Sequence, residues 1–345
     1  MLKEILGKVV SGQNLSEAEA CAVMEKVMEG EATPAQIAAL LTALRLKGET
    51  VDEITGFARV MRQKATAVKI KSPMVVDTCG TGGDGANTFN ISTTAALVLA
   101  GAGVKVAKHG NRSASSKCGS ADVLEKLGVN LELEPEAIAD CLEEVGIAFL
   151  YAPALHKAMS HAVGPRRELG FRTVFNILGP LTNPVGAKAH VLGVYNRELT
   201  KTMAGVLARL GVVRAFVVHG AGGLDEVSPV GAAEVCEVRD GKVTCYRLDP
   251  GDYGIKRASV SDLAGGIPEE NALITRQVLA GEKGPRRDAV VLNAALGFMS
   301  VGATEDYKTG ILLAQKCIDE GYALQKLNDL VAFTKRYTRK QVAGL

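Results

Sequence analysis

The chain contains no tryptophan and few other aromatic residues, with 8 Phe and 7 Tyr among 345 residues. This composition argues against an aromatic-rich β sandwich, whereas the 38 glycines suggest many tight strand–helix turns. The seven cysteines are an odd number and include no C-x-x-C pair, so we expect reduced cysteines and no disulfide framework. The apolar stretch over residues 95–107 is too short to cross a membrane, and Gly101, Gly103 and Lys105 interrupt it. With acidic Glu4 and no long apolar segment at its start, the chain is expected to be cytoplasmic, without a membrane partner.

Neither sign of charge is in large excess, because 40 Lys and Arg oppose 38 Asp and Glu for a net charge of +2. Nucleic-acid-binding proteins usually carry a clear basic excess, so nucleic acid is not an expected partner. The 47% of hydrophobic residues excludes a disordered chain. At roughly 150 residues a domain, the length indicates about two domains, or one large domain with an appendage.

The first 70 residues are typical of three or four short amphipathic helices. Capping boxes stand at residues 16–19, 33–36 and 50–53, and Pro34 occupies a first helical position. Apolar residues follow each box at helical spacing. These segments are expected to pack together as a small helical domain.

From Pro73 onward, short apolar runs alternate with helical patterns. Expected strands cover residues 74–77, 104–107, 148–151, 190–195 and 215–219, with an antiparallel pair at 234–239 and 242–248 around Asp240-Gly241. Expected helices start at residue 92 and cover 121–127, 135–145, 199–210 and most of 269–335. This alternation predicts an α/β fold with a mostly parallel central sheet flanked by helices.

A glycine-rich loop follows the first predicted strand, with four glycines in the six residues 80–85. Without Cβ atoms, the backbone amides of such a loop can approach an anion closely. The helix that opens at residues 90–94 adds further amides and a favourable dipole. A tight strand–helix turn is the alternative explanation. The loop matches neither G-x-G-x-x-G nor G-x-x-x-x-G-K-[ST], so neither a dinucleotide fold nor a nucleotide triphosphatase is indicated.

The loop after the second predicted strand, residues 108–116, is rich in hydroxyl and amide donors. No Asp or Glu occurs between Gly85 and Ala121, whereas the basic residues there are Lys105, Lys108, Arg112 and Lys117. Ligands of open α/β sheets lie beyond the carboxyl ends of the strands, so we expect both loops to line one positively charged crevice suited to phosphates. A solvated basic loop is the alternative, and His109 alone is more often a structural histidine than a catalyst.

Two adjacent carboxylates, Asp225 and Glu226, lie in a glycine-rich loop after the strand predicted at residues 215–219. Mg²⁺ in proteins is commonly held by one or two carboxylates together with substrate phosphates. Beside a phosphate site this pair therefore suggests Mg²⁺, whereas an exposed acidic turn would explain the pair in isolation.

Six segments in chain order closely resemble motifs of the anthranilate phosphoribosyltransferase family. They are GTGGD at 80–84, NIST at 90–93, KHGNR at 108–112, GSADVLE at 119–125, FNILGPLTNP at 175–184 and LDEVSP at 224–229. Cys118 departs from the pattern, since a serine often stands there.

The resemblance implies a nucleoside phosphorylase/phosphoribosyltransferase-like fold and a homodimer formed through the helical domain. Residues 1–70 would form that domain, completed by a helical segment near 165–188, and residues 71–345 an α/β phosphoribosyl-binding domain. The implied activity moves phosphoribose from 5-phosphoribosyl-1-diphosphate to the amino group of anthranilate, with Mg²⁺ as cofactor.

Site residues follow from the same resemblance. The donor site would consist of Gly80, Gly83, Asp84, Thr88, Asn90, Ser92, Thr93, Lys108, Asn111, Ser116 and Ser120. Mg²⁺ would contact Ser92, Asp225 and Glu226. Arg166 would bind the anthranilate carboxylate, with Asn111, His109 and His156 nearby, and a guanidinium can indeed fork onto both carboxylate oxygens. Without the resemblance, Arg166 would be a surface arginine beside Arg167.

No clear nucleophile–base pair is present, and the catalytic residues are left open. A neutral aromatic amine needs little activation by a base, so positioning and electrostatics are expected to supply most of the acceleration. Two other functions remain as alternatives, a pyrimidine nucleoside phosphorylase-like enzyme and a catalytically silent paralogue that binds nucleic acid.

Overall fold

The N-terminal helices of the computed structural model begin where the capping signals predict. They are α1 (Leu2–Val10), α2 (Glu17–Met28), α3 (Pro34–Lys47) and α4 (Val51–Lys64). The side chains of Ser16, Thr33 and Thr50 each accept a hydrogen bond from the backbone N–H three residues on, and all three capping boxes are closed. The structure describes residues 2–113 and 116–343.

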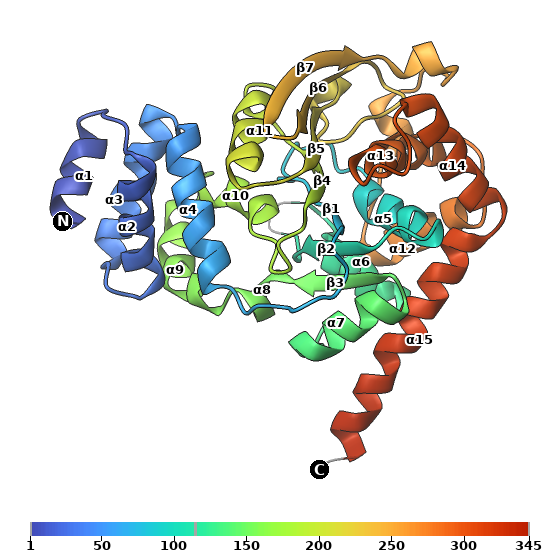
Figure 1. Cartoon of the computed structure of the whole chain (residues 1–345), viewed down its shortest axis with the longest axis horizontal. Coiled ribbons are helices and arrows are strands. Elements are labelled where there is room, and N and C mark those ends of the chain that lie inside the picture. The colour runs from blue at the N-terminus through green and yellow to red at the C-terminus, as the bar shows by residue number, and fades with distance from the viewer. Residues whose placement is uncertain (1, 114–115, 344–345) are drawn as a thin grey trace.

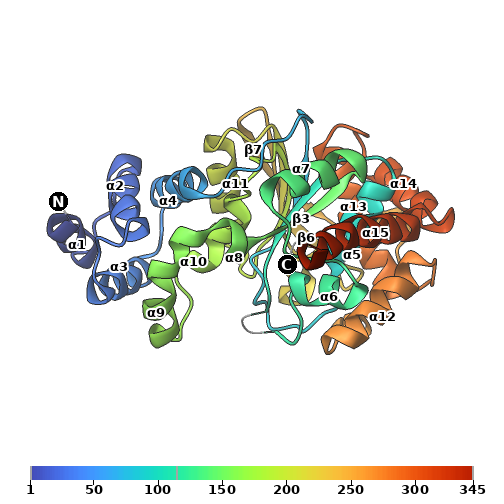
Figure 2. The same ribbon diagram turned by 90° about the horizontal axis from the view of Figure 1, so that it is seen from below.

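A second group of short helices lies beside this bundle in both ribbon views (Figures 1 and 2): α8 (Ala152–Leu155), α9 (Ser160–Leu169) and α10 (Phe175–Leu178). Helix α9 contacts α2 and α3, and α10 contacts α4. Ala162 and Leu178 are buried in the same hydrophobic core as Leu41 and Phe57. The domain boundary near residue 70, with 165–188 assigned to the helical domain, stays a prediction.

The larger part of the molecule is built on a seven-stranded sheet in the order β3-β2-β1-β4-β5-β6-β7. The strands are β1 (Val76–Thr78), β2 (Val106–Gly110), β3 (Ile147–Tyr151), β4 (Ala189–Gly193), β5 (Arg214–His219), β6 (Ala233–Arg239) and β7 (Lys242–Leu248). The first five pair in parallel, and β6 and β7 are antiparallel. Asp240 and Gly241 have φ values of 50° and 79°, as a tight hairpin turn requires. The mostly parallel sheet is confirmed.

Both faces of the sheet are covered by helices (Figure 1). Helices α5 (Ile91–Gly101) and α13 (Pro285–Ser300) contact one face, and α11 (Leu199–Arg209) contacts β5, β6 and β7 from the other. Along β5, Phe216 and Val218 belong to the first hydrophobic core, whereas Ala215 and Val217 belong to the core shared with the N-terminal helices. Burial on both faces explains why this strand is continuously apolar. The remaining long helices are α6 (Ser120–Leu127), α7 (Pro135–Glu144), α12 (Pro268–Leu279), α14 (Tyr307–Asp319) and α15 (Tyr322–Ala343).

The cysteines depart from the sequence-based expectation at one place. Cys236 on β6 lies opposite Cys245 on β7, and the two form a disulfide. The other five cysteines are free. The expectation of a wholly reduced chain is therefore wrong for the hairpin, although a single bridge is not a disulfide framework. Within the described residues, none of the helices combines the length and the apolar character that a membrane span needs.

A buried histidine on β4 links stability to pH. The Nε2 atom of His190 lies 3.1 Å from the carbonyl oxygen of Ala187. Burial, and secondarily the charge of Arg62, lowers the pKa of His190 to about 3. The folded protein therefore keeps His190 neutral, whereas the unfolded chain takes up a proton near pH 6.5. The free energy of unfolding is therefore highest above pH 6.5, and it decreases as the pH falls from 6.5 toward 3.

His190→Gln removes this titration while the amide retains an N–H donor. Between pH 7 and pH 5, the free energy of unfolding of the wild type is expected to fall by about 2 kcal/mol more than that of the variant. Urea unfolding of both proteins at the two pH values measures the difference. Identical pH dependence would contradict the prediction.

Candidate functional site

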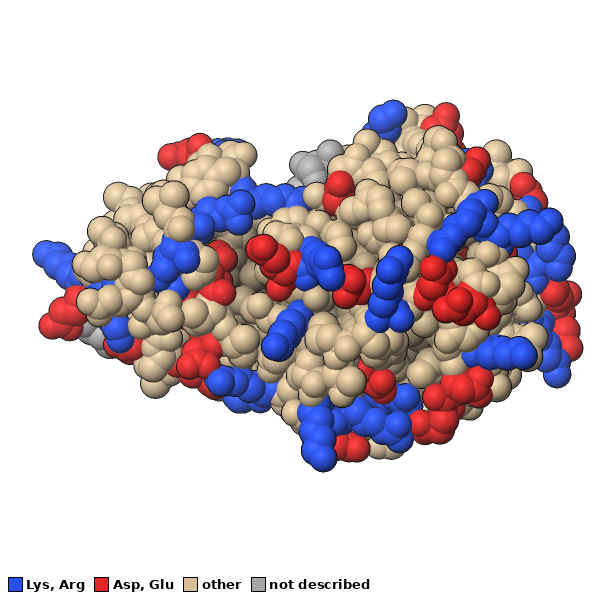
Figure 3. Space-filling view, turned by 90° about the horizontal axis from the view of Figure 1, so that it is seen from above, with Lys and Arg blue, Asp and Glu red and all other residues tan. Residues whose placement is uncertain are grey.

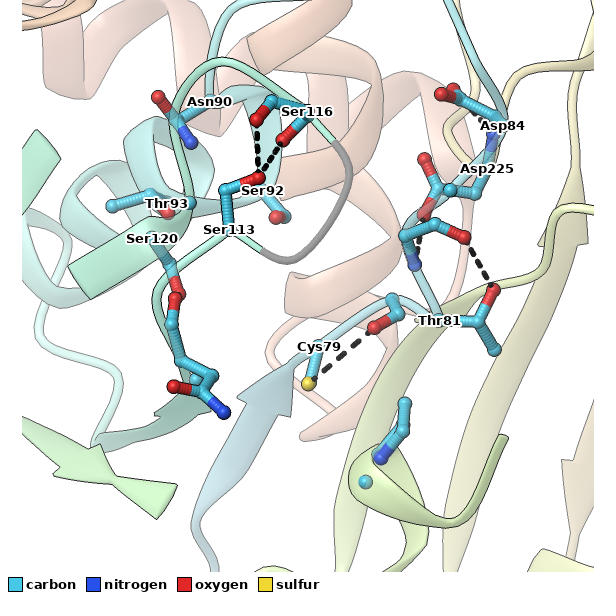
Figure 4. A pocket seen from close by; sticks show the side chains of 18 of the residues that line it. Cys79, Thr81, Asp84, Asn90, Ser92, Thr93, Ser113, Ser116, Ser120 and Asp225 are labelled. Carbon is cyan, nitrogen blue, oxygen red and sulfur yellow. Dashed lines mark hydrogen bonds between the residues drawn. The ribbon is translucent and has the colours of Figure 1, made fainter. Parts of the chain in front are cut away.

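A cavity of about 360 Å³ lies at the carboxyl ends of the parallel strands. Its walls come from the loops that follow β1, β2 and β5, together with the segment between α9 and α10. The strand order reverses between β1 and β4, and this is the position where open α/β sheets bind ligands. Figure 4 shows Asp84 and Asp225 on one side of the cavity and Asn90, Ser116 and Ser120 on the opposite side.

All but one of the residues assigned to the site from the sequence line this cavity. They are Gly80, Gly83, Asp84, Thr88, Asn90, Ser92, Thr93, Lys108, His109, Asn111, Ser116, Ser120, Arg166, Asp225 and Glu226. His156 is not among the lining residues. The cavity also contains residues to which the sequence analysis assigned no role: Arg172, Phe175, Asn176, Gly179 and Pro180. The last four belong to the FNILGPLTNP motif, which could have indicated them, whereas no motif pointed to Arg172.

The glycine-rich loop makes a tight turn, and the side chains of Asp225 and Arg172 approach its backbone closely. Gly82, Gly83 and Gly85 have φ values of 61°, 72° and 77°, which disfavour other residues. A Cβ atom on Gly80 would lie 2.7 Å from Oδ2 of Asp225, and one on Gly83 would overlap the guanidinium of Arg172. The glycines therefore satisfy the requirements of a tight turn and also let neighbouring groups approach the backbone.

Three carboxylates meet at one corner of the cavity. Oδ2 of Asp225 accepts a hydrogen bond from the Gly82 amide at 2.9 Å, and Oε1 of Glu226 accepts one from the Ser92 amide at 3.1 Å. Burial, followed by the charge of Asp84, raises the pKa of Asp225 to about 7. Burial, followed by the charge of Asp225, raises the pKa of Glu226 to about 8. A cation bound at this corner would offset the repulsion and favour the ionised forms.

The positive field expected from the sequence is only partly present. Lys108 is buried in the cavity wall, where its Nζ donates to the carbonyl oxygen of Thr78 at 2.5 Å. Lys105 donates instead to backbone carbonyls of α7, and neither Lys105 nor Lys117 lines the cavity. Arg112 lines the cavity, but its guanidinium is paired with Asp122 and Glu125. The expectation that Lys105 and Lys117 contribute positive charge to the crevice was therefore wrong.

Two histidines lie one behind the other at the base of the cavity. The Nδ1 atom of His109 lies 3.1 Å from the carbonyl oxygen of Gly179, and its Nε2 is buried without a partner. The rings of His109 and His156 are 5.1 Å apart between centroids. Burial, and then the proximity of His156, lowers the pKa of His109 to about 3, and burial lowers that of His156 to about 4. Both rings are therefore neutral near pH 7, and neither can form an ion pair with an anionic ligand.

A second cluster of possible metal ligands borders the cavity, where one ligand atom from each of Asp77, Cys79 and His109 falls within 4.8 Å of the others. The oxygens of Asp77 are already used, because they accept from the backbone amide of His109 at 3.1 Å and from Nδ2 of Asn183 at 2.8 Å. Burial also raises the pKa of the Cys79 thiol well above its usual range. These bonds join β1, β2 and the loop before β4, and they identify the cluster as structural.

Arg166 lies on α9 and lines the cavity. Its guanidinium carbon lies 5.1 Å from the centroid of the Phe175 ring, and burial lowers its pKa. A guanidinium remains charged even so. Arg166 forms no ion pair with another side chain in residues 2–113 and 116–343, whereas its neighbour Arg167 is exposed and outside the cavity.

Comparison with known protein families matches the two parts of the chain to two domains of glycosyl transferases. A family described as "Glycosyl transferase family, a/b domain" matches residues 72–324, and one described as "Glycosyl transferase family, helical bundle domain" matches residues 3–65. The chain is 65% identical to an anthranilate phosphoribosyltransferase of Pelotomaculum thermopropionicum over 97% of both chains. It is 60% identical to that of Desulforamulus reducens over the whole of both chains.

The solved structures that resemble this chain are also anthranilate phosphoribosyltransferases. The anthranilate phosphoribosyltransferase of Thermus thermophilus superposes with a TM-score of 0.91 at 48% identity, covering 96% of this chain and 99% of the other. The enzyme of Saccharomyces cerevisiae in complex with PRPP and Mg superposes with a TM-score of 0.88 at 30% identity, covering 97% and 98%.

Proposed function

The chain belongs to the anthranilate phosphoribosyltransferase family, and we propose that the cavity at the carboxyl ends of β1, β2 and β5 is its active site. The protein is a glycosyltransferase of tryptophan biosynthesis. It transfers the phosphoribosyl group of 5-phosphoribosyl-1-diphosphate to the amino group of anthranilate and releases diphosphate. The observation that carries the site assignment is the presence of the glycine loop, the three-carboxylate corner and Arg166 around one cavity.

The comparisons give no support to a nucleoside phosphorylase or a nucleic-acid-binding paralogue. On the face shown in Figure 3, basic and acidic side chains are intermingled.

We assign the phosphoribosyl donor to the glycine loop and the hydroxyl-rich wall opposite it. The first group supplies backbone amides, and the second supplies side-chain donors for phosphate oxygens and ribose hydroxyls. The residues proposed for these contacts are Gly80, Gly83, Asp84, Thr88, Asn90, Ser92, Thr93, Lys108, Asn111, Ser116 and Ser120. Several of these groups lie at the start of α5, whose dipole also favours an anion.

Mg²⁺ fits the acidic corner, because Asp225 and Glu226 offer buried carboxylate oxygens and Ser92 lies against Glu226. Oxygen donors of this kind are the ligands that Mg²⁺ prefers. Bound there, the ion would neutralise charge that develops on the departing diphosphate. The chain's own contribution is to hold the carboxylates at the edge of the donor site, through the amides of Gly82 and Ser92.

The acceptor is assigned to the wall formed by Arg166, Asn111 and His109, with His156 behind His109. Arg166 would fix the carboxylate of anthranilate, and the neutral His109 presents an Nε2 lone pair that can accept an N–H. The amine of anthranilate is uncharged near pH 7, so its attack on C1 requires mainly correct placement. We assign no general base.

The decisive test of the function follows anthranilate fluorescence. Purified protein with 5-phosphoribosyl-1-diphosphate and Mg²⁺ is expected to consume anthranilate and release diphosphate in equal amounts. Phosphorolysis of thymidine or uridine, assayed in parallel, is expected to be absent. Stable anthranilate fluorescence under these conditions would contradict the function.

Two glycines of the loop should respond differently to the same substitution. Valine at either Gly82 or Gly83 imposes a positive φ on a β-branched residue, but only at Gly83 would the Cβ overlap Arg172, since no atom lies within 4 Å at Gly82. Gly83→Val is expected to weaken binding of 5-phosphoribosyl-1-diphosphate at least about tenfold, and Gly82→Val is expected to have the smaller effect. Calorimetric titration of the folded variants measures both affinities. Wild-type affinity in Gly83→Val would contradict the assignment.

The helical domain offers an apolar surface for a second copy of the chain. Helices α1 and α3 line a shallow depression with Val9, Ala39 and Ala43, and at its rim Leu46 is 83% exposed and Val10 66% exposed. Exposed apolar patches of this kind commonly mark protein interfaces. We propose that two copies of the chain form a homodimer through this surface. We also propose that the protein is cytoplasmic. Leu46→Glu is expected to convert the dimer to a monomer in light scattering, and a wild-type protein that is monomeric at micromolar concentration would contradict it.

A further inference from the structure

Arg172 connects the glycine loop to the segment between α9 and α10. Its Nη2 donates to the carbonyl oxygen of Gly83 at 2.5 Å. Its guanidinium carbon lies 4.0 Å from the centroid of the Tyr195 ring, which follows β4. The side chain also lines the cavity. One guanidinium thus spans three segments that are far apart in the sequence.

The other terminal nitrogen of the same group, Nη1, is buried and has no hydrogen-bond partner. Arg172 also forms no ion pair with any acidic side chain in the described part of the chain. Leaving a buried, charged donor unsatisfied is costly, and stacking on an aromatic ring together with the bond to Gly83 fixes the plane of the guanidinium. An arginine held in this way is set up to bind an anion from the cavity.

Two other basic side chains of the cavity wall are already bonded to protein groups, which leaves fewer candidates for binding an anionic substrate. Lys108 donates to Thr78, and Arg112 is paired with Asp122 and Glu125. Among the described arginines that line the cavity, Arg166 and Arg172 are left without an acidic partner. Two free guanidinium groups match two anionic substrates. Because Arg172 is bonded to the glycine loop, the donor's phosphates are its nearer ligand.

We propose that Arg172 is a further donor-binding residue: it holds the glycine loop through Gly83, and its guanidinium binds a phosphate oxygen of 5-phosphoribosyl-1-diphosphate at the cavity wall. The proposal rests on the proposed function and adds a residue to its donor site. It also explains why residue 83 must be glycine, since any side chain there would displace the guanidinium.

Steady-state kinetics of Arg172→Gln and Arg172→Lys, with each substrate varied in turn, tests the proposal. Arg172→Gln is expected to raise the KM for 5-phosphoribosyl-1-diphosphate about 10- to 100-fold, the loss of a hydrogen bond to a charged group, and to change the KM for anthranilate less than about threefold. Arg172→Lys should recover part of the loss, because it keeps the charge and loses the fork. Arg167→Gln, a change at an exposed arginine five residues earlier, is the matched control and is expected to behave as wild type.

Equal effects on both KM values, or an unchanged donor KM, would overturn the proposal. Wild-type protein in the same assay separates this from failure of the function, because an inactive wild type would overturn the function itself. Binding of inorganic diphosphate, measured by calorimetry without anthranilate, is expected to weaken by the same factor in Arg172→Gln.

A double variant tests the contact with the loop. Gly83→Ala is expected to weaken donor binding strongly in the wild-type background and much less in the Arg172→Ala background, where the overlapping guanidinium is gone. Additive effects of the two changes would show that Arg172 does not hold the loop in the working enzyme, and would overturn that part of the proposal.

Discussion

Replacing Asp225 by Asn and Glu226 by Gln together is expected to lower kcat at least about 100-fold, the scale on which one preorganised electrostatic contact acts in other enzymes. Both changes keep the shape of the side chain and remove its charge. The leaving diphosphate would then depart without a cation held beside it. Stopped assays of diphosphate release across a Mg²⁺ titration measure the effect, with stimulation expected in the wild type and little in the variant.

The same variant should remain folded. Burial and mutual repulsion raise the pKa values of Asp225 and Glu226 to about 7 and about 8, so their ionised forms are unfavourable in the protein without a bound cation. The amide oxygens can still accept from Gly82 and Ser92. We therefore expect an unfolding midpoint equal to or above that of the wild type.

A matched control makes the same chemical change elsewhere. Glu136→Gln with Asp140→Asn alters one exposed acid of each kind on α7, away from the cavity, and should leave kcat unchanged. Wild-type activity that does not respond to Mg²⁺ removal and readdition would contradict the metal assignment, even if the Asp225/Glu226 variant were impaired.

Features encoded by neighbouring residues were predictable from the sequence. The capping boxes fix where α2, α3 and α4 begin, because donor and acceptor are only three residues apart. The turn at Asp240-Gly241 fixes the register of β6 and β7, because few other residues accept two successive positive φ values. The positive φ values of Gly82, Gly83 and Gly85 follow in the same way from glycines placed shortly after a strand, and phosphate binding by this loop stays a prediction.

Features that depend on distant segments were not predictable. Arg172 meets Gly83 across 89 residues and Tyr195 across β4, so no local pattern marks it. Lys105 immediately precedes β2 and lies at the amino end of that strand, at the edge of the sheet away from the cavity, where its amine reaches the end of α7. The ring of His156 lies next to that of His109 but does not line the cavity, and the spacing of the two residues along the chain does not encode this difference.

The disulfide between Cys236 and Cys245 lies between these two cases, because it could be predicted only in part from the sequence. The strands at 234–239 and 242–248 were predicted as an antiparallel pair, and a turn at residues 240–241 places Cys236 opposite Cys245. The pairing was implicit in that register, but a count of cysteines and their C-x-x-C spacing does not reveal it. Register, more than composition, decides which cysteines can meet.

Arg166→Ala is expected to raise the apparent KM for anthranilate about 10- to 100-fold, and to change the KM for 5-phosphoribosyl-1-diphosphate far less. The interaction removed is a charge-assisted pair of the kind worth about 1.5–3 kcal/mol. In the structure this guanidinium stacks near Phe175, lines the cavity and has no acidic partner among the described residues, so its charge is available to a ligand. Steady-state kinetics with each substrate varied in turn measures the split.

Two further variants locate the effect at this side chain. Arg166→Lys should restore only part of the anthranilate affinity, because an ammonium cannot bond both carboxylate oxygens in one plane. Arg167→Ala removes the same charge one residue along α9, where the side chain is exposed and outside the cavity, and should be nearly silent. If Arg166→Ala leaves the anthranilate KM and kcat/KM at their wild-type values, or if Arg167→Ala is the damaging change, the acceptor lies elsewhere. Opposite selectivity of Arg166 and Arg172 variants, one for each substrate, would establish that the two free guanidinium groups divide the two anions between them.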